Sequence, residues 1–328
     1  MTKRLKVGLI GAGAMGANHA RVVATSLSAD LTIVVDPVAE QAERLADSAG
    51  AAAASDHTAL YKCDAAIVAC PTEHHTAIAL DLLDRGMPLL VEKPLASELS
   101  QVEKLIDAAE RNDTPLTCGF VERFNAAVTT AVGLLDEAPI HILSTRHSPP
   151  TPRIATSVVY DLLIHDIDLA MRLVPQSTVE AAVGAAPQDA ATGTAEVADC
   201  ILRFSSGAVG TLSASRVSQR KIRSLLVSTS TELFDVDLLR QDVTVYRNVR
   251  QGQGGSPPGY QAETIIDIPF VRHAGEPLAL QFEHFVRLVH GDVDAVVERA
   301  SLLPPHLVAA EIDGTAIGRP TALTGATK

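Results

Sequence analysis

The sequence predicts an α/β protein with two domains, the first a doubly wound parallel sheet and the second an α/β domain with a large, open, mostly antiparallel sheet. A length of 328 residues is too great for one ordinary domain. Short apolar runs alternate with helical segments over residues 5–119, and successive strand-like runs follow over residues 179–268. We place the two domains at residues 1–121 and 122–328.

The first domain is predicted from short apolar runs that suit buried parallel strands. These runs cover residues 5–10, 31–35, 65–69, 89–91 and 116–118. Helical segments separate them, near residues 14–25, 38–48 and 73–85 and from residue 97 onward. Because such segments join the strands of a parallel sheet through right-handed crossovers, helices are expected on both faces.

The pattern changes near Glu122. Helices are predicted at residues 122–135 and 157–173, with a strand near residues 140–144 between them. Further strands follow at residues 201–204, 208–215, 224–230, 233–236 and 242–246. Turn residues separate several of these runs, which indicates an antiparallel sheet with one face open. Two helices, near residues 278–290 and 305–317, close the chain.

The charge and the cysteines exclude several classes of function. The formal net charge is −12, whereas nucleic acids and anionic membranes need clustered Lys and Arg. We interpret the densest basic stretch, Arg216 to Arg223, as a solvated strand edge or an oligomer rim. The four cysteines have no C-x-x-C spacing, so neither a zinc site nor a disulfide scaffold is expected. Without an apolar run of ~20 residues, we expect a cytoplasmic protein that spans no membrane.

A glycine turn follows the first predicted strand and opens the first helix, with Gly11, Gly13 and Gly16 in the spacing G-x-G-x-x-G. In such a turn the first glycine permits the tight bend, the second lets a pyrophosphate approach the backbone, and the third lets helix and strand pack closely. The helix N-terminus, at Ala14 and Met15, adds N–H groups and partial positive charge. An ordinary glycine turn is the alternative, but the flanking strand and helix favour a Rossmann dinucleotide site.

Asp36 supports this interpretation and indicates which dinucleotide binds. It lies twenty residues past Gly16, at the end of the second predicted strand. A carboxylate at this point binds a ribose 2′-hydroxyl and repels a 2′-phosphate. The sequence therefore favours NAD over NADP as the cofactor.

Two later strand ends supply further candidate cofactor ligands, because ligands of open α/β sheets lie beyond the carboxyl ends of the strands. The third strand is followed by Pro71, Thr72 and His75, and the fourth by Glu92 and Lys93. A Glu-Lys pair at a strand end, immediately before a proline, puts a cation at the floor of the cleft. The alternative for this pair is a surface ion pair.

These features resemble the glucose–fructose oxidoreductase and inositol dehydrogenase family, Gfo/Idh/MocA, over nearly the whole chain. The resemblance is carried by the glycine turn, Pro71 with His75, Glu92-Lys93-Pro94, Gly119-Phe120 with Arg123-Phe124-Asn125, and Asp161-x-x-x-His165-Asp166-x-Asp168. It implies a Rossmann domain followed by an α/β domain with an open sheet, through which chains form a homodimer or homotetramer. It also implies that Lys93, Asp161 and His165 face the nicotinamide and the substrate.

The helix that precedes Pro175 carries a candidate acid–base group. Asp161, His165 and Asp168 are spaced i, i+4 and i+7, which places them within about 60° of one another on an α-helix. His165 is the candidate base that takes an alcohol proton as hydride leaves the same carbon, and Lys93 would polarise the oxygen. Asp161 would bind a neighbouring hydroxyl or steady His165, whereas Asp168 has a structural alternative. No metal is expected, because no second histidine lies at ligand spacing.

The motifs around residues 119–125 and 161–168 are similar to the branch that includes UDP-N-acetylglucosamine 3-dehydrogenases. Beside the three catalytic candidates, the substrate-binding candidates are Glu122, Arg123, Asn125, Arg146 and Arg153. The last two could take a phosphate or diphosphate, or could be rim residues. Because the residue after Asn125 departs from the proline common in that branch, a sugar nucleotide, a sugar phosphate, a free sugar and a cyclitol all stay open as substrates.

The predicted function is an NAD-dependent dehydrogenase of a sugar, sugar nucleotide or cyclitol. Two alternatives are an NAD-dependent glycosidase that acts through transient oxidation at C3, and a non-catalytic NAD-sensing regulator. Retention of Lys93 and His165 argues against the regulator. The other histidines, among them His19, His57 and His284, fit no cluster and are expected to be structural or at the surface.

Overall fold

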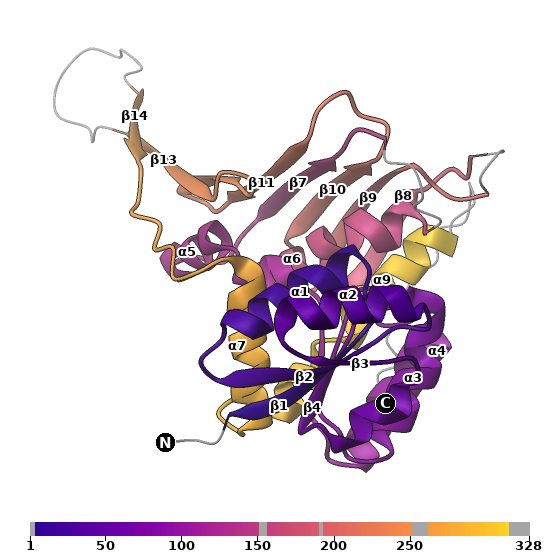
Figure 1. Ribbon diagram of the computed structural model, residues 1–328. Helices are drawn as coiled ribbons and strands as arrows, with labels where there is room; N and C mark the ends of the chain where they lie inside the picture. Colours follow the sequence, from indigo (N-terminus) through magenta and orange to yellow (C-terminus); the bar gives the residue numbers. More distant parts are fainter. Residues whose placement is uncertain (1–3, 151–155, 190–192, 251–261, 315–328) are drawn as a thin grey trace, which may run out of the picture. The chain divides into compact units, whose positions relative to one another are not determined.

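The computed structural model describes residues 4–150, 156–189, 193–250 and 262–314 (Figure 1). By its internal contacts the chain divides into two compact units. The first unit combines residues 1–124 with 275–310, and the second combines residues 125–274 with 311–328. The domain boundary at residues 121 and 122 stays a prediction, but as packing units the structure groups residues 275–310 with the N-terminal part.

The first unit contains the predicted doubly wound parallel sheet. Its six strands run in the order β3-β2-β1-β4-β5-β6 and all neighbours are parallel. The strands are β1 (Leu5–Ile10), β2 (Ala29–Val35), β3 (Ala52–Ala54), β4 (Ala65–Val68), β5 (Leu89–Val91) and β6 (Leu116–Cys118). The order reverses between β1 and β4, and ligands of such sheets bind beyond the strand ends at that point. The sequence missed β3 because three alanines carry little β-propensity.

The helices of the first unit complete its core. They are α1 (Ala14–Thr25), α2 (Ala39–Ala49), α3 (His75–Leu83), α4 (Leu99–Arg111), α7 (Pro277–Val289) and α8 (Ala295–Ala300). Phe282 and Phe285 of α7 are fully buried in one cluster with Val7 and Leu9 of β1. A segment from late in the chain therefore supplies the largest side chains of this N-terminal core, which explains why residues 275–310 belong to the first unit.

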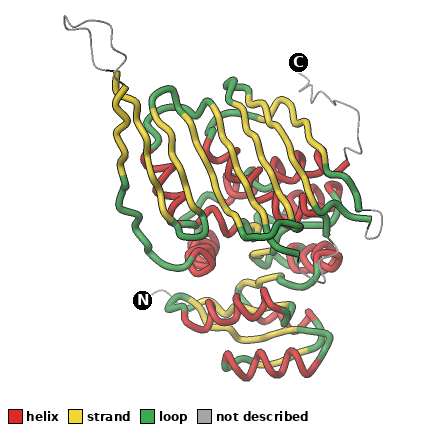
Figure 2. The backbone as a smooth tube through the Cα atoms, turned by 90° about the horizontal axis from the view of Figure 1, so that it is seen from above, coloured by secondary structure: helices red, strands yellow, loops and turns green. Residues whose placement is uncertain are grey.

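The second unit contains the predicted open sheet, whose strands lie side by side in Figure 2. Its strand pairs are mixed and mostly antiparallel. Its eight strands run in the order β14-β13-β12-β11-β7-β10-β9-β8, and only β7 and β10 pair in parallel. The strands are β7 (His141–His147), β8 (Val179–Ala185), β9 (Val197–Phe204), β10 (Val209–Ser215), β11 (Ile222–Ser228), β12 (Glu232–Asp237), β13 (Asp242–Arg250) and β14 (Ala262–Asp267).

Helices cover one face of this sheet. α5 (Ala126–Leu134) contacts β12 and β13, while α6 (Ile164–Leu173) contacts β7 and β10. Alternate residues of β9 are buried and exposed, as expected for a strand with one covered face. The predicted helix over residues 122–135 is instead a 3₁₀ turn, Val121–Phe124, followed by α5, because Asn125 caps a new helix.

The last helix, α9 (Leu303–Gly314), starts near its predicted position, and its predicted end at residue 317 lies outside the described residues. Across the part of the chain that the structure describes, every helix is too short or too polar to cross a membrane.

Candidate active site

A cavity of about 690 Å³ lies beside the glycine turn of the first unit. Five of the predicted cofactor ligands line it, namely Gly11, Gly13, Met15, Asp36 and Pro71. The other six, Ala14, Gly16, Thr72, His75, Glu92 and Lys93, do not. The cavity has the size of an ordinary ligand pocket and lies at the carboxyl ends of β1, β2 and β4, where the strand order reverses. We refer to it as the glycine-turn cavity.

The three glycines of the turn differ in what surrounds them. Gly11 has a φ of +98°, and a Cβ there would lie 2.6 Å from the carbonyl carbon of Ala69. A Cβ at Gly16 would lie 1.8 Å from the carbonyl oxygen of Gly11. At Gly13 a Cβ would meet no atom within 4 Å, and this residue lines the cavity. Gly11 and Gly16 are thus required for the bend and for packing, whereas Gly13 leaves space for a ligand against the backbone.

The N-terminus of α1 begins at this open glycine. Gly13 is its N-cap residue, and no side chain caps the helix. The first N–H groups of a helix have no partner within the helix, and together they carry partial positive charge. The turn can therefore bind a pyrophosphate through backbone groups alone.

Asp36 follows β2 and lines the same cavity. Its Oδ2 accepts a hydrogen bond of 2.8 Å from the N–H of Ala12, and its Oδ1 accepts one of 2.9 Å from the N–H of Val38. These bonds hold the carboxylate in place, and each oxygen retains acceptor capacity for a further donor. The described residues that line the cavity include a second carboxylate, Asp56, and no Lys or Arg.

His75 links two loops of the first unit instead of lining the cavity. Its Nδ1 lies 3.1 Å from the carbonyl oxygen of Pro94, and its Nε2 lies 2.9 Å from that of Cys70. Burial of the ring lowers the pKa of His75, although both carbonyls oppose this effect. The histidine thereby connects the segment after β4 with the segment after β5, next to Lys93.

Glu92 has a buried partner that the sequence did not indicate. The Nε2 of His19, on α1, lies 2.7 Å from the Oε1 of Glu92, and the His19 side chain is fully buried. The Oε2 of Glu92 accepts a hydrogen bond from the N–H of Lys93, and a Cβ at Gly119 would lie 2.5 Å from this oxygen. The alternative of a surface ion pair at residues 92 and 93 is therefore wrong for Glu92, because its carboxylate is buried against His19.

The candidate acid–base residues of the second unit lie on two kinds of helix. Residues 159–163, which include Asp161, form a π-helical turn, and His165 follows on α6. His165 and Asp168 are buried on α6, while the Asp161 side chain is 19% exposed. The estimate of 60° assumed one regular α-helix and does not hold for Asp161, because a π turn is wider. Such turns occur frequently at functional sites.

Arg146 is buried in an ion pair. Its Nε lies 2.7 Å from the Oδ2 of Asp166 and its Nη2 lies 3.0 Å from the Oδ1, which also accepts a hydrogen bond from the hydroxyl of Ser144. Arg146 is only 3% exposed. Asp166 thus engages two nitrogens of the guanidinium group, and the phosphate contact of Arg146 stays a prediction. Arg153 lies outside the described residues.

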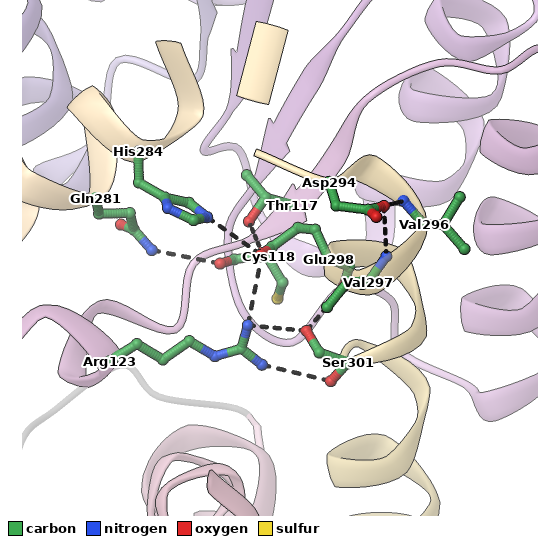
Figure 3. Close-up of polar contacts among 10 residues, drawn as sticks. All are labelled: Thr117, Cys118, Arg123, Gln281, His284, Asp294, Val296, Val297, Glu298 and Ser301. Atoms are coloured by element: carbon green, nitrogen blue, oxygen red, sulfur yellow. Dashed lines mark hydrogen bonds and ion pairs between the residues drawn. The ribbon is translucent and has the colours of Figure 1, made fainter. Parts of the chain in front are cut away.

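Arg123 also has a structural position, in a buried cluster around Glu298 (Figure 3). Its Nη1 donates to the hydroxyl of Ser301 and lies 3.5 Å from the Oε1 of Glu298. Glu298 also accepts hydrogen bonds of 2.6 Å from the hydroxyl of Thr117 and 3.1 Å from the Nε2 of His284. Burial alone would raise the pKa of Glu298, but His284, Arg123 and Thr117 together lower it from 4.5 to about 2.

Two further substrate candidates lie beside this segment of the chain. The Asn125 side chain accepts from the N–H of Ala127 at the start of α5 and donates to the carbonyl oxygen of Leu238. Asn125 and Arg123 therefore hold backbone and side-chain groups of the protein, and their substrate contacts stay predictions. Glu122, in the 3₁₀ turn, is partly exposed, and its role in substrate binding stays a prediction.

Arg216 is not the solvated residue that the basic stretch suggested. It follows β10, is 4% exposed, and forms two hydrogen bonds of 3.0 Å with the carboxylate of Glu196. Its Nη1 lies 3.7 Å from the Oδ2 of Asp161. The expectation of a surface residue was wrong for Arg216, because a run of charges in the sequence does not reveal buried partners for one of its members.

Comparisons with known proteins agree with both units. Residues 5–120 match the family described as "Oxidoreductase family, NAD-binding Rossmann fold", and residues 138–232 match the "GFO/IDH/MocA C-terminal domain". The chain is 30% identical over 266 residues to a UDP-N-acetylglucosamine 3-dehydrogenase of Acidithiobacillus ferrooxidans, covering 80% of this chain and 82% of that protein. It is 32% identical over 228 residues to the myo-inositol dehydrogenase Hyg17 of Streptomyces leeuwenhoekii, covering 65% and 70%.

Solved structures show the same fold. The structure of the Acidithiobacillus ferrooxidans UDP-N-acetylglucosamine 3-dehydrogenase superposes with a TM-score of 0.82 at 24% identity, over 95% of this chain and 97% of that chain. A myo-inositol dehydrogenase from Corynebacterium glutamicum superposes with a TM-score of 0.79 at 21% identity, over 99% and 100%.

Proposed function

This chain belongs to the Gfo/Idh/MocA oxidoreductase family, and from that premise we propose that it is an NAD-dependent dehydrogenase of a cyclic polyol. Its substrate is the secondary alcohol of a sugar, a sugar nucleotide or a cyclitol. The observation that carries the proposal is the glycine-turn cavity, where Gly13 leaves the backbone open and Asp36 is held by two backbone N–H groups.

The cavity favours NAD over NADP. The N-terminus of α1 would hold the pyrophosphate, and the fixed carboxylate of Asp36 would accept hydrogen bonds from the ribose hydroxyls. A 2′-phosphate would meet two carboxylates, those of Asp36 and Asp56, and no Lys or Arg among the described residues of the lining. The negative charges of the phosphate and of these carboxylates repel each other, so NADP binds more weakly than NAD.

The chemistry follows from the predicted roles of three side chains. Bound NAD supplies an acceptor for the hydride that leaves the carbinol carbon. His165 accepts the hydroxyl proton, and Lys93 stabilises negative charge on the oxygen as the ketone forms. Asp161 accepts a hydrogen bond from a neighbouring hydroxyl or stabilises the protonated ring of His165. These roles rest on the sequence pattern of the family, and the following experiment tests them.

The test is NAD reduction, followed at 340 nm, across sugars, sugar phosphates, sugar nucleotides and cyclitols. With the best substrate, Lys93→Met and His165→Ala should each lower kcat by about 10²-fold or more, with NAD affinity retained. Exposed residues provide matched controls, Lys104→Met and His290→Ala, and these should keep wild-type turnover. Wild-type turnover in both site variants would reject the assigned roles.

The same panel separates the two alternatives. A glycosidase that oxidises C3 transiently would cleave a glycoside without net NADH, which mass analysis of the products detects. A sensing regulator would bind NAD and a partner protein but turn over no polyol. Either result would replace the dehydrogenase proposal.

A further inference from the structure

We propose that Arg216 is a positioning residue for the acid–base group of the second unit. It anchors the start of the π-helical turn that leads to His165 and places a buried cation beside the carboxylate of Asp161. The inference rests on the proposed function, because it assumes that Asp161 and His165 act in the reaction. It adds to that function a residue at the end of β10, which is distant in sequence from the motif at residues 161–168.

The guanidinium group of Arg216 is fully engaged inside the second unit. Its Nε and Nη2 donate to the two carboxylate oxygens of Glu196, each at 3.0 Å. Such parallel hydrogen bonds fix the plane of the group, which a lysine cannot reproduce. Glu196 precedes β9 and Arg216 follows β10, so this pair joins the ends of two antiparallel neighbours.

The remaining donors of Arg216 reach the entrance of the π turn. Nη1 donates to the carbonyl oxygen of Thr156 at 2.7 Å, and Nη2 donates to that of Ala195 at 3.2 Å. The carbonyl of Ala195 also accepts the N–H of Val158, the residue just before the turn. Arg216 and the turn thus share an acceptor, and Arg216 holds the backbone two residues before that shared contact.

The contact with Asp161 differs in kind from these hydrogen bonds. At 3.7 Å between Nη1 and Oδ2 it is an ion pair without a directional bond. Arg216 therefore places a positive charge beside Asp161 without fixing the orientation of its oxygens. Because the Asp161 side chain is partly exposed while that of Arg216 is 4% exposed, the cation acts from the buried side of the carboxylate.

Charge balance supports this role. One buried cation, Arg216, faces two carboxylates, those of Asp161 and Glu196. Two other charged residues, Asp166 on α6 and Arg146 on β7, form a separate ion pair. Asp168 also lies on α6. Without Arg216, the turn would lose the hydrogen bond to Thr156 and the buried cation beside Asp161 and Glu196.

Kinetics of four variants test the inference. Arg216→Met should lower kcat more than 10-fold and leave the NAD dissociation constant unchanged. Arg216→Lys should lower kcat by a smaller factor, because it keeps the positive charge. Because Arg216 contacts both Asp161 and the backbone of its turn, the double variant with Asp161→Asn should lose less kcat than the product of the two single effects. Arg216→Met at wild-type kcat, or a double variant as slow as the product of the two single effects, would overturn the proposal.

Two controls separate positioning from loss of stability. Arg203→Met removes an exposed arginine of β9 and should keep wild-type turnover. Leu212→Ala opens a cavity at a fully buried position of β10 and should lower the melting temperature without a matching fall in kcat. If Leu212→Ala loses as much kcat as Arg216→Met, the effect is one of stability and the proposal fails.

Hydrogen exchange of residues 156–163 gives a readout that needs no substrate. In Arg216→Met these amides should exchange at least 10-fold faster than in the wild type, while those of β7 should not change. If the wild-type protein oxidises no polyol, the proposed function fails and this exchange rate alone decides whether Arg216 holds the turn. Unchanged exchange would overturn the positioning role, whatever the activity.

Discussion

Each unit contains a buried cluster of an arginine with carboxylates, and the two clusters differ in their ratio of acidic to basic groups. In the first unit one carboxylate, Glu298, accepts hydrogen bonds from Thr117 and His284 and forms an ion pair with Arg123 at 3.5 Å. In the second unit one cation, Arg216, faces two carboxylates, and one of these is only an ion pair partner at 3.7 Å. The buried contacts of Glu298 suit a structural role, whereas the partly exposed Asp161 keeps surface for the contact with substrate that we propose.

The comparison also shows what the sequence could not predict about three arginines. Arg123 and Arg146 were substrate candidates and Arg216 was expected at a solvated edge, and all three are buried beside protein carboxylates. Burial of a guanidinium group depends on partners up to 175 residues away, as with Arg123 and Glu298, and no local pattern records such a pairing.

The strongest expected effect comes from breaking the structural cluster. Arg123→Met would leave Glu298 buried without its arginine, and removal of one partner of a buried ion pair costs about 3–5 kcal/mol. We expect the unfolding free energy, measured by urea titration, to fall by that amount. A fall smaller than that of the exposed-pair variant Arg203→Met would show that the cluster does not stabilise the first unit.

Acid should weaken the same cluster. The folded-state pKa of Glu298 is lowered from 4.5 to about 2, so its stabilisation is present above pH 4.5 and is lost as the pH falls toward 2. The full contribution is roughly 3 kcal/mol. The gap in unfolding free energy between wild type and Glu298→Gln should therefore shrink between pH 5 and pH 2.

The exposed variant Glu103→Gln is the control for this experiment. Its difference from the wild type should stay small and nearly constant over the same pH interval. A Glu298→Gln gap that does not change with pH would show that the Glu298 carboxylate is not stabilised in its ionised form.

A smaller effect is expected at Asp36, whose carboxylate shares features with both Glu298 and Asp161. Two backbone N–H groups hold it, yet it lines the glycine-turn cavity. Asp36→Ser should raise the NAD dissociation constant about 10-fold, as for a lost charge-assisted hydrogen bond, and should narrow the preference for NAD over NADP. Calorimetric titration of both cofactors measures this, with the exposed variant Asp47→Ser as the control. An unchanged ratio of the two affinities would remove Asp36 from cofactor selection.

The two units also differ in how far the sequence predicted them. The glycine turn, the alternation of strand and helix and the position of Asp36 are local patterns, and the structure confirms the parallel sheet they predict. The return of α7 to the first unit depends on packing of Phe282 and Phe285 against β1, which is not local. The His19–Glu92 contact joins residues 73 positions apart, so His19 gave no signal beyond its place on the helix after the turn.

For the candidate site of the second unit, the sequence predicted which residues belong to it but not how they are arranged. The spacing of Asp161, His165 and Asp168 assumed a regular helix, but residues 159–163 form a π turn. Nothing in the sequence marks this change of helix type, and Arg216 reaches the turn from the end of β10. The residues of the motif were therefore predictable, while their surroundings were not.

Transfer of deuterium tests the central claim most directly. Substrates labelled with deuterium at the carbinol carbon are incubated with the protein and NAD, and the reduced cofactor is analysed by mass spectrometry. An NAD-dependent dehydrogenase predicts that the label appears on the nicotinamide, one deuterium for each ketone formed. Tight binding of NAD with no label transferred from any sugar, sugar nucleotide or cyclitol would contradict the account.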